Sequence, residues 1–249
     1  MLKKIRSKLK WLDPFTYVDI YLMPKLNPNE NEAISWIVYL ACAFIFAWLI
    51  YTGLGLLLGT ASPMMIVVSA SMEPLYHRGD IIILHGAQAN SLEGPIVESG
   101  LPSLREKELA SFASLSYSGG QLDSISFDSG QNLGITKDGS VVVYWSTHLR
   151  KPVVHRAVAK LHAGDGWYVL TKGDSKQNST LDQDCGLILN GSPEKECIEL
   201  YPVPLENLQG KAFFHVPIVG CVKLWLLDDL GSLLSTGRLP AEYREGNFC

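Results

Sequence analysis

The most informative stretch of this chain reads Ser69-Ala70-Ser71-Met72-Glu73-Pro74 and is followed by Arg78-Gly79-Asp80-Ile81-Ile82-Ile83-Leu84. It lies a few residues after a long apolar segment that carries no charged side chain. It places the hydroxyl of Ser71 between an apolar strand, predicted over residues 65–68, and a turn that leads into a second strand. A nucleophile just outside a membrane is what a membrane-tethered serine enzyme requires.

The apolar segment before this stretch is long enough to cross a bilayer. From Ala33 to Met72 the chain contains no Asp, Glu, Lys, Arg or His. Because a bilayer core needs about 20 apolar residues in a helix, we predict one transmembrane helix over residues 33–59. A cleaved signal peptide is the alternative, but the apolar run is too long for one and begins too far from Met1.

Basic residues set the orientation of the predicted helix. Those that precede it are Lys3, Lys4, Arg6, Lys8, Lys10 and Lys25, whereas Arg78 is the first basic residue after it. Because such residues stay in the cytoplasm, residues 1–32 are predicted to be a cytoplasmic basic segment. Everything after residue 59 then lies on the outer face of the cell membrane, or in the ER lumen of a eukaryote. Residues 2–12 fit either a plain basic tail or a short helix on the membrane surface.

Composition narrows the function classes. The chain has 249 residues, of which 47% are hydrophobic and 18% charged, with a net charge of -4. This is apolar for a soluble protein and too polar for one with many spans, so a lipid bilayer is an expected partner. The basic residues form no stripe outside the N-terminus, so nucleic acid is not expected as a partner. No Cys or His pair has metal-ligand spacing, and we expect neither a metal nor a cofactor.

The exported part, residues 60–221, is predicted to be mainly β. Short runs rich in Val, Ile, Phe and Tyr recur along it, at Ile81–Leu84, Val141–Tyr144, Val153–Val158, Trp167–Thr171 and Lys211–His215. Such a series predicts a compact, barrel-like β domain. Residues 86–134 show weaker periodicity, apart from a helical pattern over 103–113, and are interpreted as an insertion. Charges interrupt residues 222–249, which are predicted to pack on the domain or to rest on the membrane surface.

Two cysteines of the exported part flank a loop. Cys185 and Cys197 would face an oxidising compartment, and the residues between them include Asn190-Gly191-Ser192-Pro193. A disulfide between the two is one pairing that the sequence permits, but spacing alone does not establish it.

A serine nucleophile needs a base and a group that orients the base. His155 is the histidine that stands out, because it lies in the apolar run from Pro152 to Val158, where an imidazole is costly to bury without a partner. On composition alone, a mid-strand histidine is more often a structural group with a satisfied hydrogen bond than a catalytic one. Asp174 and Asp182 lie in a polar loop after a predicted strand, where either carboxylate could reach a histidine on a neighbouring strand. An aspartate that only caps a turn is the alternative for each.

Together these residues resemble a known family. The stretches 69–74 and 78–80, then 139–144, 154–156, 172–174 with 182–183, and 210–220 resemble the successive boxes of type I signal peptidases, in order. The pair His155-Arg156 makes the chain similar to the archaeal and ER subtype, because the bacterial and organellar subtype has lysine at the position of His155. The resemblance covers the predicted span and most of the exported part outside residues 86–134. It implies a signal-peptidase-like β catalytic domain anchored by one N-terminal transmembrane helix.

The resemblance assigns roles to individual residues. It implies that Ser71 is the acylating nucleophile and His155 the general base, and that the Ser69 hydroxyl helps to hold the oxyanion. Asp182 and Asp174 match the two acidic positions, with Asp182 the better candidate to orient the base.

The chain also departs from the family pattern at two places. The interval between the two acidic positions is longer than usual, so Asp184 stays an alternative third residue. In addition, Ser140 replaces an aspartate that usually precedes the Val-Val-Tyr strand.

The implied reaction is removal of signal peptides from exported preproteins at the outer membrane face. Preproteins, the bilayer and the protein-export translocon are the partners that this implies, with small residues preferred before the scissile bond. Two alternatives remain. A Ser-Lys protease would use Lys151 or Lys160 as its base, and a non-catalytic β domain that acts as a binding or assembly module would not need Ser71.

Overall fold

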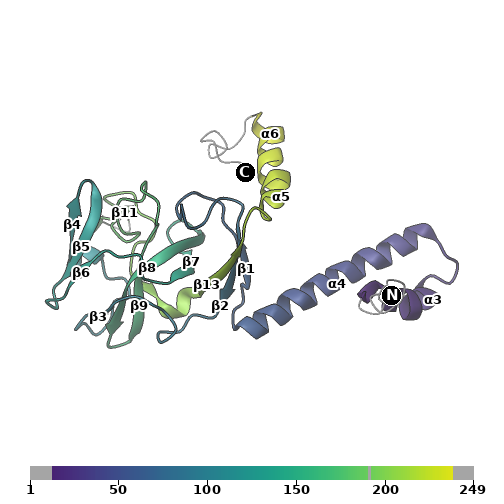
Figure 1. Ribbon diagram of the computed structural model, residues 1–249, viewed down its shortest axis with the longest axis horizontal. Helices are drawn as coiled ribbons and strands as arrows, with labels where there is room; N and C mark the ends of the chain where they lie inside the picture. Colours follow the sequence, from purple (N-terminus) through teal and green to yellow (C-terminus); the bar gives the residue numbers. More distant parts are fainter. Residues whose placement is uncertain (1–12, 190–191, 238–249) are drawn as a thin grey trace, which may run out of the picture. The chain divides into compact units, whose positions relative to one another are not determined.

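The computed structural model describes residues 13–189 and 192–237 of the chain (Figure 1). It divides into two compact units, Met1–Leu57 and Leu58–Cys249. The predicted tail or surface helix at residues 2–12 lies outside the described residues. So do the last twelve residues of the predicted C-terminal segment.

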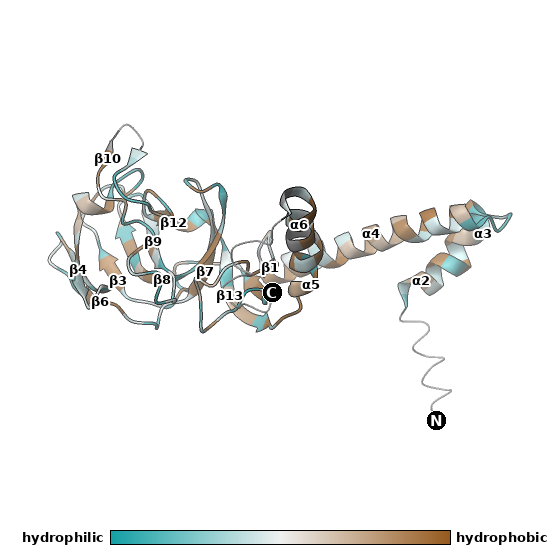
Figure 2. Cartoon of the chain, turned by 90° about the horizontal axis from the view of Figure 1, so that it is seen from above, coloured by the Kyte–Doolittle hydropathy of each residue, from teal (hydrophilic) through white to brown (hydrophobic). Residues whose placement is uncertain are grey.

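The first unit consists of helices. A broken helical stretch contains α2 (Pro14–Tyr17), a π-helix (Val18–Leu22) and α3 (Met23–Leu26), and it precedes the long helix α4 (Glu32–Leu58). The side-chain amide of Asn31 caps α4 by accepting a hydrogen bond from the backbone N–H of Ala33. Most of α4 has the apolar and neutral colours of Figure 2. Within the described residues it is the one helix long and apolar enough to cross a membrane, and its bounds match the predicted helix within one residue.

The second unit is built on a large β-sheet, which confirms the mainly β prediction. The sheet order is β1-β2-β13-β7-β8-β9-β12, and β3 pairs in parallel with β8, whereas the other neighbours are antiparallel. Each predicted strand has a counterpart, although the one predicted over residues 65–68 spans Met64–Ile66. The strands are β1 (Met64–Ile66), β2 (Ile81–His85), β3 (Ile96–Glu98), β7 (Val141–Ser146), β8 (Lys151–Ala163), β9 (Gly166–Lys172), β12 (Val203–Pro204) and β13 (Leu208–Val216).

Residues 86–134 form more structure than predicted. They contain β3, a 3-10 turn (Leu109–Ser111) and a separate antiparallel sheet of β4 (Ala113–Ser118), β5 (Gln121–Phe127) and β6 (Asn132–Gly134). The helical pattern predicted over residues 103–113 is wrong except for that single turn, because Leu109 and Phe112 are used instead to fill the core between this sheet and β8 and β9. Figure 1 shows the small sheet at one end of the β unit.

Short elements complete the second unit. The strands β10 (Ile188–Leu189) and β11 (Ser192–Pro193) pair with each other, and a 3-10 turn (Leu205–Asn207) precedes β13. The C-terminal segment contains α5 (Cys221–Lys223), a π-helix (Leu224–Asp229) and α6 (Leu230–Thr236). Leu224 is buried, whereas Trp225 and Leu234 are 61% and 79% exposed. Leu224 therefore packs into the unit, whereas Trp225 and Leu234 are left uncovered.

The turn between β1 and β2 is anchored in the core. Met72 is fully buried and packs with Ile82 and Val143. The buried carboxylate of Asp80 accepts hydrogen bonds from the backbone N–H groups of His77 and Ile218, at 3.0 and 3.2 Å. Asp80 thus joins the box at residues 78–80 directly to the box at residues 210–220. The loop between β1 and β2 is held near its start by Met72 and at its end by Asp80.

Gly139 allows β7 and β8 to approach each other. A Cβ atom at this position would lie 1.8 Å from the backbone oxygen of Ala157. We expect Gly139→Ala to lower the free energy of unfolding by at least about 2 kcal/mol, because the backbone must move to relieve the clash. Gly134→Ala is the matched control, since nothing lies within 4 Å of its added Cβ. Thermal unfolding of both purified variants measures the difference, and equal stability of the two would show that this approach does not constrain the fold.

Candidate active site

Ser71 lies in the turn between β1 and β2 and is half-buried. Its hydroxyl oxygen is 3.2 Å from that of Ser69. Its backbone oxygen accepts a hydrogen bond of 3.0 Å from the N–H of Ser175, which follows β9. A Cβ atom at Gly173 would lie 2.7 Å from the same oxygen, so the absence of a side chain there lets the two segments touch. The nucleophile candidate is therefore fixed against the end of β9.

His155 lies in the middle of β8, opposite Val142 of β7, and is only 2% exposed. Its Nδ1 is 2.6 Å from Oδ2 of Asp182, a residue that is also 2% exposed. Among the described residues the structure thus brings His155 and Asp182 together in a buried pair. Within residues 13–189 and 192–237, the Ser71 hydroxyl is hydrogen-bonded to that of Ser69 and not to His155. Catalytic hydrogen bonds are often completed only when substrate binds.

Two further side chains support the buried carboxylate. Tyr144 of β7 and Thr171 of β9 donate hydrogen bonds to Oδ2 of Asp182, at 2.9 and 2.6 Å. The amide of Gln183 donates in turn to the Thr171 hydroxyl at 3.1 Å. Burial raises the pKa of the Asp182 carboxyl, but the charge of His155 and the hydrogen bonds from its donors outweigh this, so the pKa is lowered from its ordinary value. Asp182 is therefore held as a carboxylate.

An ionised carboxylate fixes the tautomer of the histidine. Since Asp182 can only accept hydrogen bonds, Nδ1 of His155 must carry the proton of the pair. Nε2 then has a free lone pair with which it can accept a proton. Burial, followed by the charge of Asp182, raises the pKa of Tyr144 well above its ordinary value, so its hydroxyl stays protonated and remains a donor. The arrangement can perform general-base chemistry.

Asp174 has a different partner. Its two oxygens accept hydrogen bonds from Nε and Nη2 of Arg156, at 2.8 and 2.6 Å, in a bidentate pair. The side chains are 6% and 12% exposed, and Nη1 of Arg156 also donates to the backbone oxygen of Gly139. Asp174 therefore ties the end of β9 to β8 and to the residues before β7, and its hydrogen bonds do not involve the imidazole of His155.

Asp184 lies away from the histidine as well. Its Oδ2 accepts hydrogen bonds from the hydroxyls of Tyr117 and Thr180, at 2.7 and 2.8 Å, and its Oδ1 is 3.5 Å from Nζ of Lys195. Burial raises the pKa of this carboxyl, but these partners lower it overall. Of the three aspartates considered from the sequence, the structure places Asp182 alone in contact with His155.

The two lysines considered as alternative bases occupy other environments. Nζ of Lys160 donates to the backbone oxygen of Leu92 at 2.7 Å, so this buried ammonium is used to hold the start of residues 86–134. Lys151 is exposed at the first position of β8. Neither environment resembles that of a base beside Ser71.

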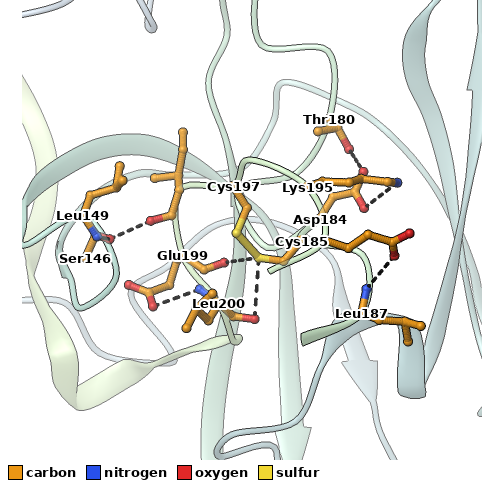
Figure 3. Close-up of a disulfide and its surroundings, with 12 residues drawn as sticks. Ser146, Leu149, Thr180, Asp184, Cys185, Leu187, Lys195, Cys197, Glu199 and Leu200 are labelled. Atoms are coloured by element: carbon orange, nitrogen blue, oxygen red, sulfur yellow. Dashed lines mark hydrogen bonds and ion pairs between the residues drawn. A yellow bond between two sulfur atoms is a disulfide. The ribbon is translucent and has the colours of Figure 1, made fainter. Parts of the chain in front are cut away.

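A disulfide lies close to the buried pair. Cys185 and Cys197 are joined, so the pairing that the sequence permitted is present (Figure 3). The backbone N–H groups of the next two residues, Ile198 and Glu199, both donate to the backbone oxygen of Asp182 at 3.0 Å. The disulfide therefore closes the loop of residues 185–197. It links the segment that contains Asp182 to the two residues that bind the backbone oxygen of Asp182.

The sequence analysis missed the residues that support Asp182. Tyr144 and Thr171 were recognised only as members of strands, and Gln183 only as part of a box. Both strand residues are polar groups within apolar runs, which is the same signal that singled out His155.

Comparison with known proteins gives a consistent result. No family model matches the chain. The signal peptidase complex catalytic subunit SEC11 of Scheffersomyces stipitis is 28% identical over 202 residues, which cover 81% of this chain and 88% of the relative. The subunit of the same name from Fusarium vanettenii is 26% identical over 198 residues (80% and 83%), and that of Schizosaccharomyces pombe 24% identical over 204 residues (80% and 85%). These matches confirm the resemblance indicated by the sequence boxes: the chain is similar to proteins named as catalytic subunits of signal peptidase complexes.

Proposed function

We propose that this chain is a membrane-anchored serine endopeptidase that removes signal peptides from exported preproteins. The observation that carries the proposal is the buried pair of His155, on β8, and Asp182, in the loop after β9 whose residue Ser175 donates a hydrogen bond to the backbone oxygen of Ser71. The names of the relatives support the same activity.

The proposed chemistry begins with Ser71. Its Oγ attacks the carbonyl carbon of the scissile peptide bond, and Nε2 of His155 takes the hydroxyl proton. The imidazolium that forms is stabilised by the carboxylate of Asp182. The oxyanion is held by the backbone N–H of Ser71 and the hydroxyl of Ser69, which lies 3.2 Å from the nucleophilic oxygen. His155 then gives the proton to the leaving amine, and water hydrolyses the acyl-enzyme.

The edge of the large sheet supports binding of an extended substrate. Within the described residues, β1 is the last strand of the sheet and pairs on one side with β2. A substrate segment could add as a further strand along residues 64–68, which lead directly to Ser69 and Ser71. We propose that small side chains are preferred before the cleaved bond, as the family resemblance implies.

The anchor would raise the local concentration of substrate. We propose that α4 spans the bilayer with residues 1–32 in the cytoplasm, so that few residues separate the membrane from Ser71. A membrane-held signal peptide would then meet the site at high effective concentration, and little intrinsic affinity would be needed. The relatives are named as subunits of a complex, so we also propose partner subunits and the export translocon as contacts.

A direct assay tests the proposed function. The wild-type chain and Ser71→Ala, purified with whatever subunits accompany them in lipid vesicles, are mixed with a model preprotein. We expect the wild type to release the mature protein and Ser71→Ala to be inactive, with the N-terminus of the product determined by mass spectrometry. Equal cleavage by the two would favour a non-catalytic binding module.

Ser71 and His155 should behave as a unit. We expect Ser71→Ala and His155→Ala each to lower turnover by ~10³ or more, and the double variant to lose little beyond either single one. His162→Ala is the control, because this histidine lies on the same strand but its ring stacks on Trp167. Losses that multiply in the double variant would contradict the pairing.

The pH dependence of activity should identify the base. Only a neutral imidazole can accept the proton of Ser71, so an imidazole base should support activity near neutral pH without the alkaline conditions that a lysine base requires. The pKa of Asp182 is lowered, so its carboxylate stays ionised near neutral pH and adds no second step. A profile that rises only above about pH 9 would instead indicate an amine base.

The three aspartates should separate by their partners. We expect Asp182→Asn to lower turnover by ~10⁴ with nearly unchanged thermal stability, because the amide disturbs the tautomer of His155. Asp174→Asn should cause a smaller loss of turnover and lower the free energy of unfolding by about 3 kcal/mol, because it breaks the ion pair with Arg156. Asp184→Asn keeps an acceptor for Tyr117 and should be close to normal.

Preprotein cleavage and thermal melting are measured for each purified aspartate variant. Full activity of Asp182→Asn together with inactive Asp184→Asn would show that the third residue is assigned wrongly.

A further inference from the structure

The loop of residues 173–184, here called the aspartate loop, carries Asp174 and Asp182 between two parts of the second unit. On one side it is held by the large sheet and its connections. The N–H of Ser175 donates to the backbone oxygen of Ser71 at 3.0 Å, and the N–H of Asp182 donates to that of Thr171 at 2.8 Å. These contacts fix where the loop begins and where it returns to β9.

The other side of the aspartate loop is held by the hairpin of β4 and β5. The backbone N–H of Leu122 donates to the backbone oxygen of Ser179 at 2.8 Å, and the side-chain amide of Gln121 donates to that of Lys176 at 3.0 Å. Leu181, which precedes Asp182, is buried in the same apolar cluster as Leu122. The small sheet therefore packs against the loop as well as against β8 and β9.

Tyr117 of β4 contacts residues on both sides of Asp182 in the chain. Its hydroxyl donates to Oδ2 of Asp184 at 2.7 Å and lies 2.6 Å from the hydroxyl of Thr180, which donates to the same carboxylate at 2.8 Å. Thr180 and Asp184 are placed two residues before and two residues after Asp182. The hydroxyl of Tyr117 thus contacts one residue before and one residue after Asp182, whose carboxylate is buried.

The geometry of the buried pair is sensitive to the position of this segment. The distance of 2.6 Å between Nδ1 of His155 and Oδ2 of Asp182 leaves little tolerance for a shift of the backbone. A misplacement of about 1 Å caused by a change remote from the reacting atoms can lower the rate by about 100-fold. Contacts that restrain residues 180 and 184 therefore also restrain Asp182, and through it the imidazole of His155.

We infer that Tyr117 is a positioning residue, and that the β4–β5 hairpin within residues 86–134 holds Asp182 in line with His155. This inference rests on the proposed function, since it assigns to the hairpin a role in that same site. Tyr117 touches neither the nucleophile nor the base and acts through Thr180 and Asp184.

The test removes one hydroxyl while it keeps the ring. We expect Tyr117→Phe to lower the kcat of preprotein cleavage by about 10-fold with KM changed by less than about twofold, since a weakened restraint misplaces the base without altering the substrate-binding edge. Tyr168→Phe is the matched control, because it removes a tyrosine hydroxyl that donates to Asp165, also at 2.7 Å, at the turn between β8 and β9. The control should keep normal kcat, and thermal melting of both variants reports the folded state.

A double-mutant cycle separates positioning from a loss of folded protein. In an Asp182→Asn background, measured in single turnovers with excess enzyme, Tyr117→Phe should cause no further loss, because the group that it positions is already altered. A similar 10-fold loss in that background, or an unchanged kcat of Tyr117→Phe alone, would overturn the inference. If instead the wild type and Ser71→Ala cleave equally, the proposed function itself fails, and the two failures are thereby distinguished.

Discussion

The hydrogen bond between His155 and Asp182 is the interaction on which the rest of the site depends. Both groups are almost fully removed from water, and a buried carboxylate is costly unless it is paired and hydrogen-bonded. Tyr144, His155 and Thr171 meet this cost together, because each donates to the same oxygen of Asp182. They lie on β7, β8 and β9, which are neighbours in the sheet, so the order of these antiparallel strands is what allows one carboxylate to receive all of them.

A second set of contacts holds Ser71, the proposed nucleophile. Met72 packs in the core and so fixes the turn that carries Ser71. The backbone N–H of Ser175 donates a hydrogen bond to the backbone oxygen of Ser71. The ion pair of Arg156 and Asp174 holds the end of β9 against β8, next to this contact. Several of the sequence boxes are therefore structural. They hold the turn of Ser71, strand β8 and the start of the aspartate loop together, as the proposed pairing of Ser71 with His155 requires.

The parts of the fold that sequence could predict are those with strong local patterns. The apolar run that forms α4 and the Val- and Ile-rich core strands were recognised because burial on both faces leaves a continuous apolar signal. The strand Ala113–Ser118 was missed, because its serines and exposed positions give only weak alternation, although Gly119 and Gly120 mark a hairpin turn after it. Spacing could not choose between Asp182 and Asp184, because the choice depends on which side of the aspartate loop faces β8.

Trapping the bond that Ser71 is proposed to form would test the role of Ser71 as nucleophile. A signal-peptide aldehyde carrying ¹³C at its carbonyl carbon should be attacked by the Ser71 oxygen, with the hydroxyl proton passing through His155 to the aldehyde oxygen. We expect a hemiacetal carbon signal in the NMR spectrum of the wild-type chain, loss of that signal in Ser71→Ala and its strong reduction in His155→Ala. An unchanged hemiacetal signal in Ser71→Ala would contradict the assignment of the nucleophile and with it the proposed mechanism.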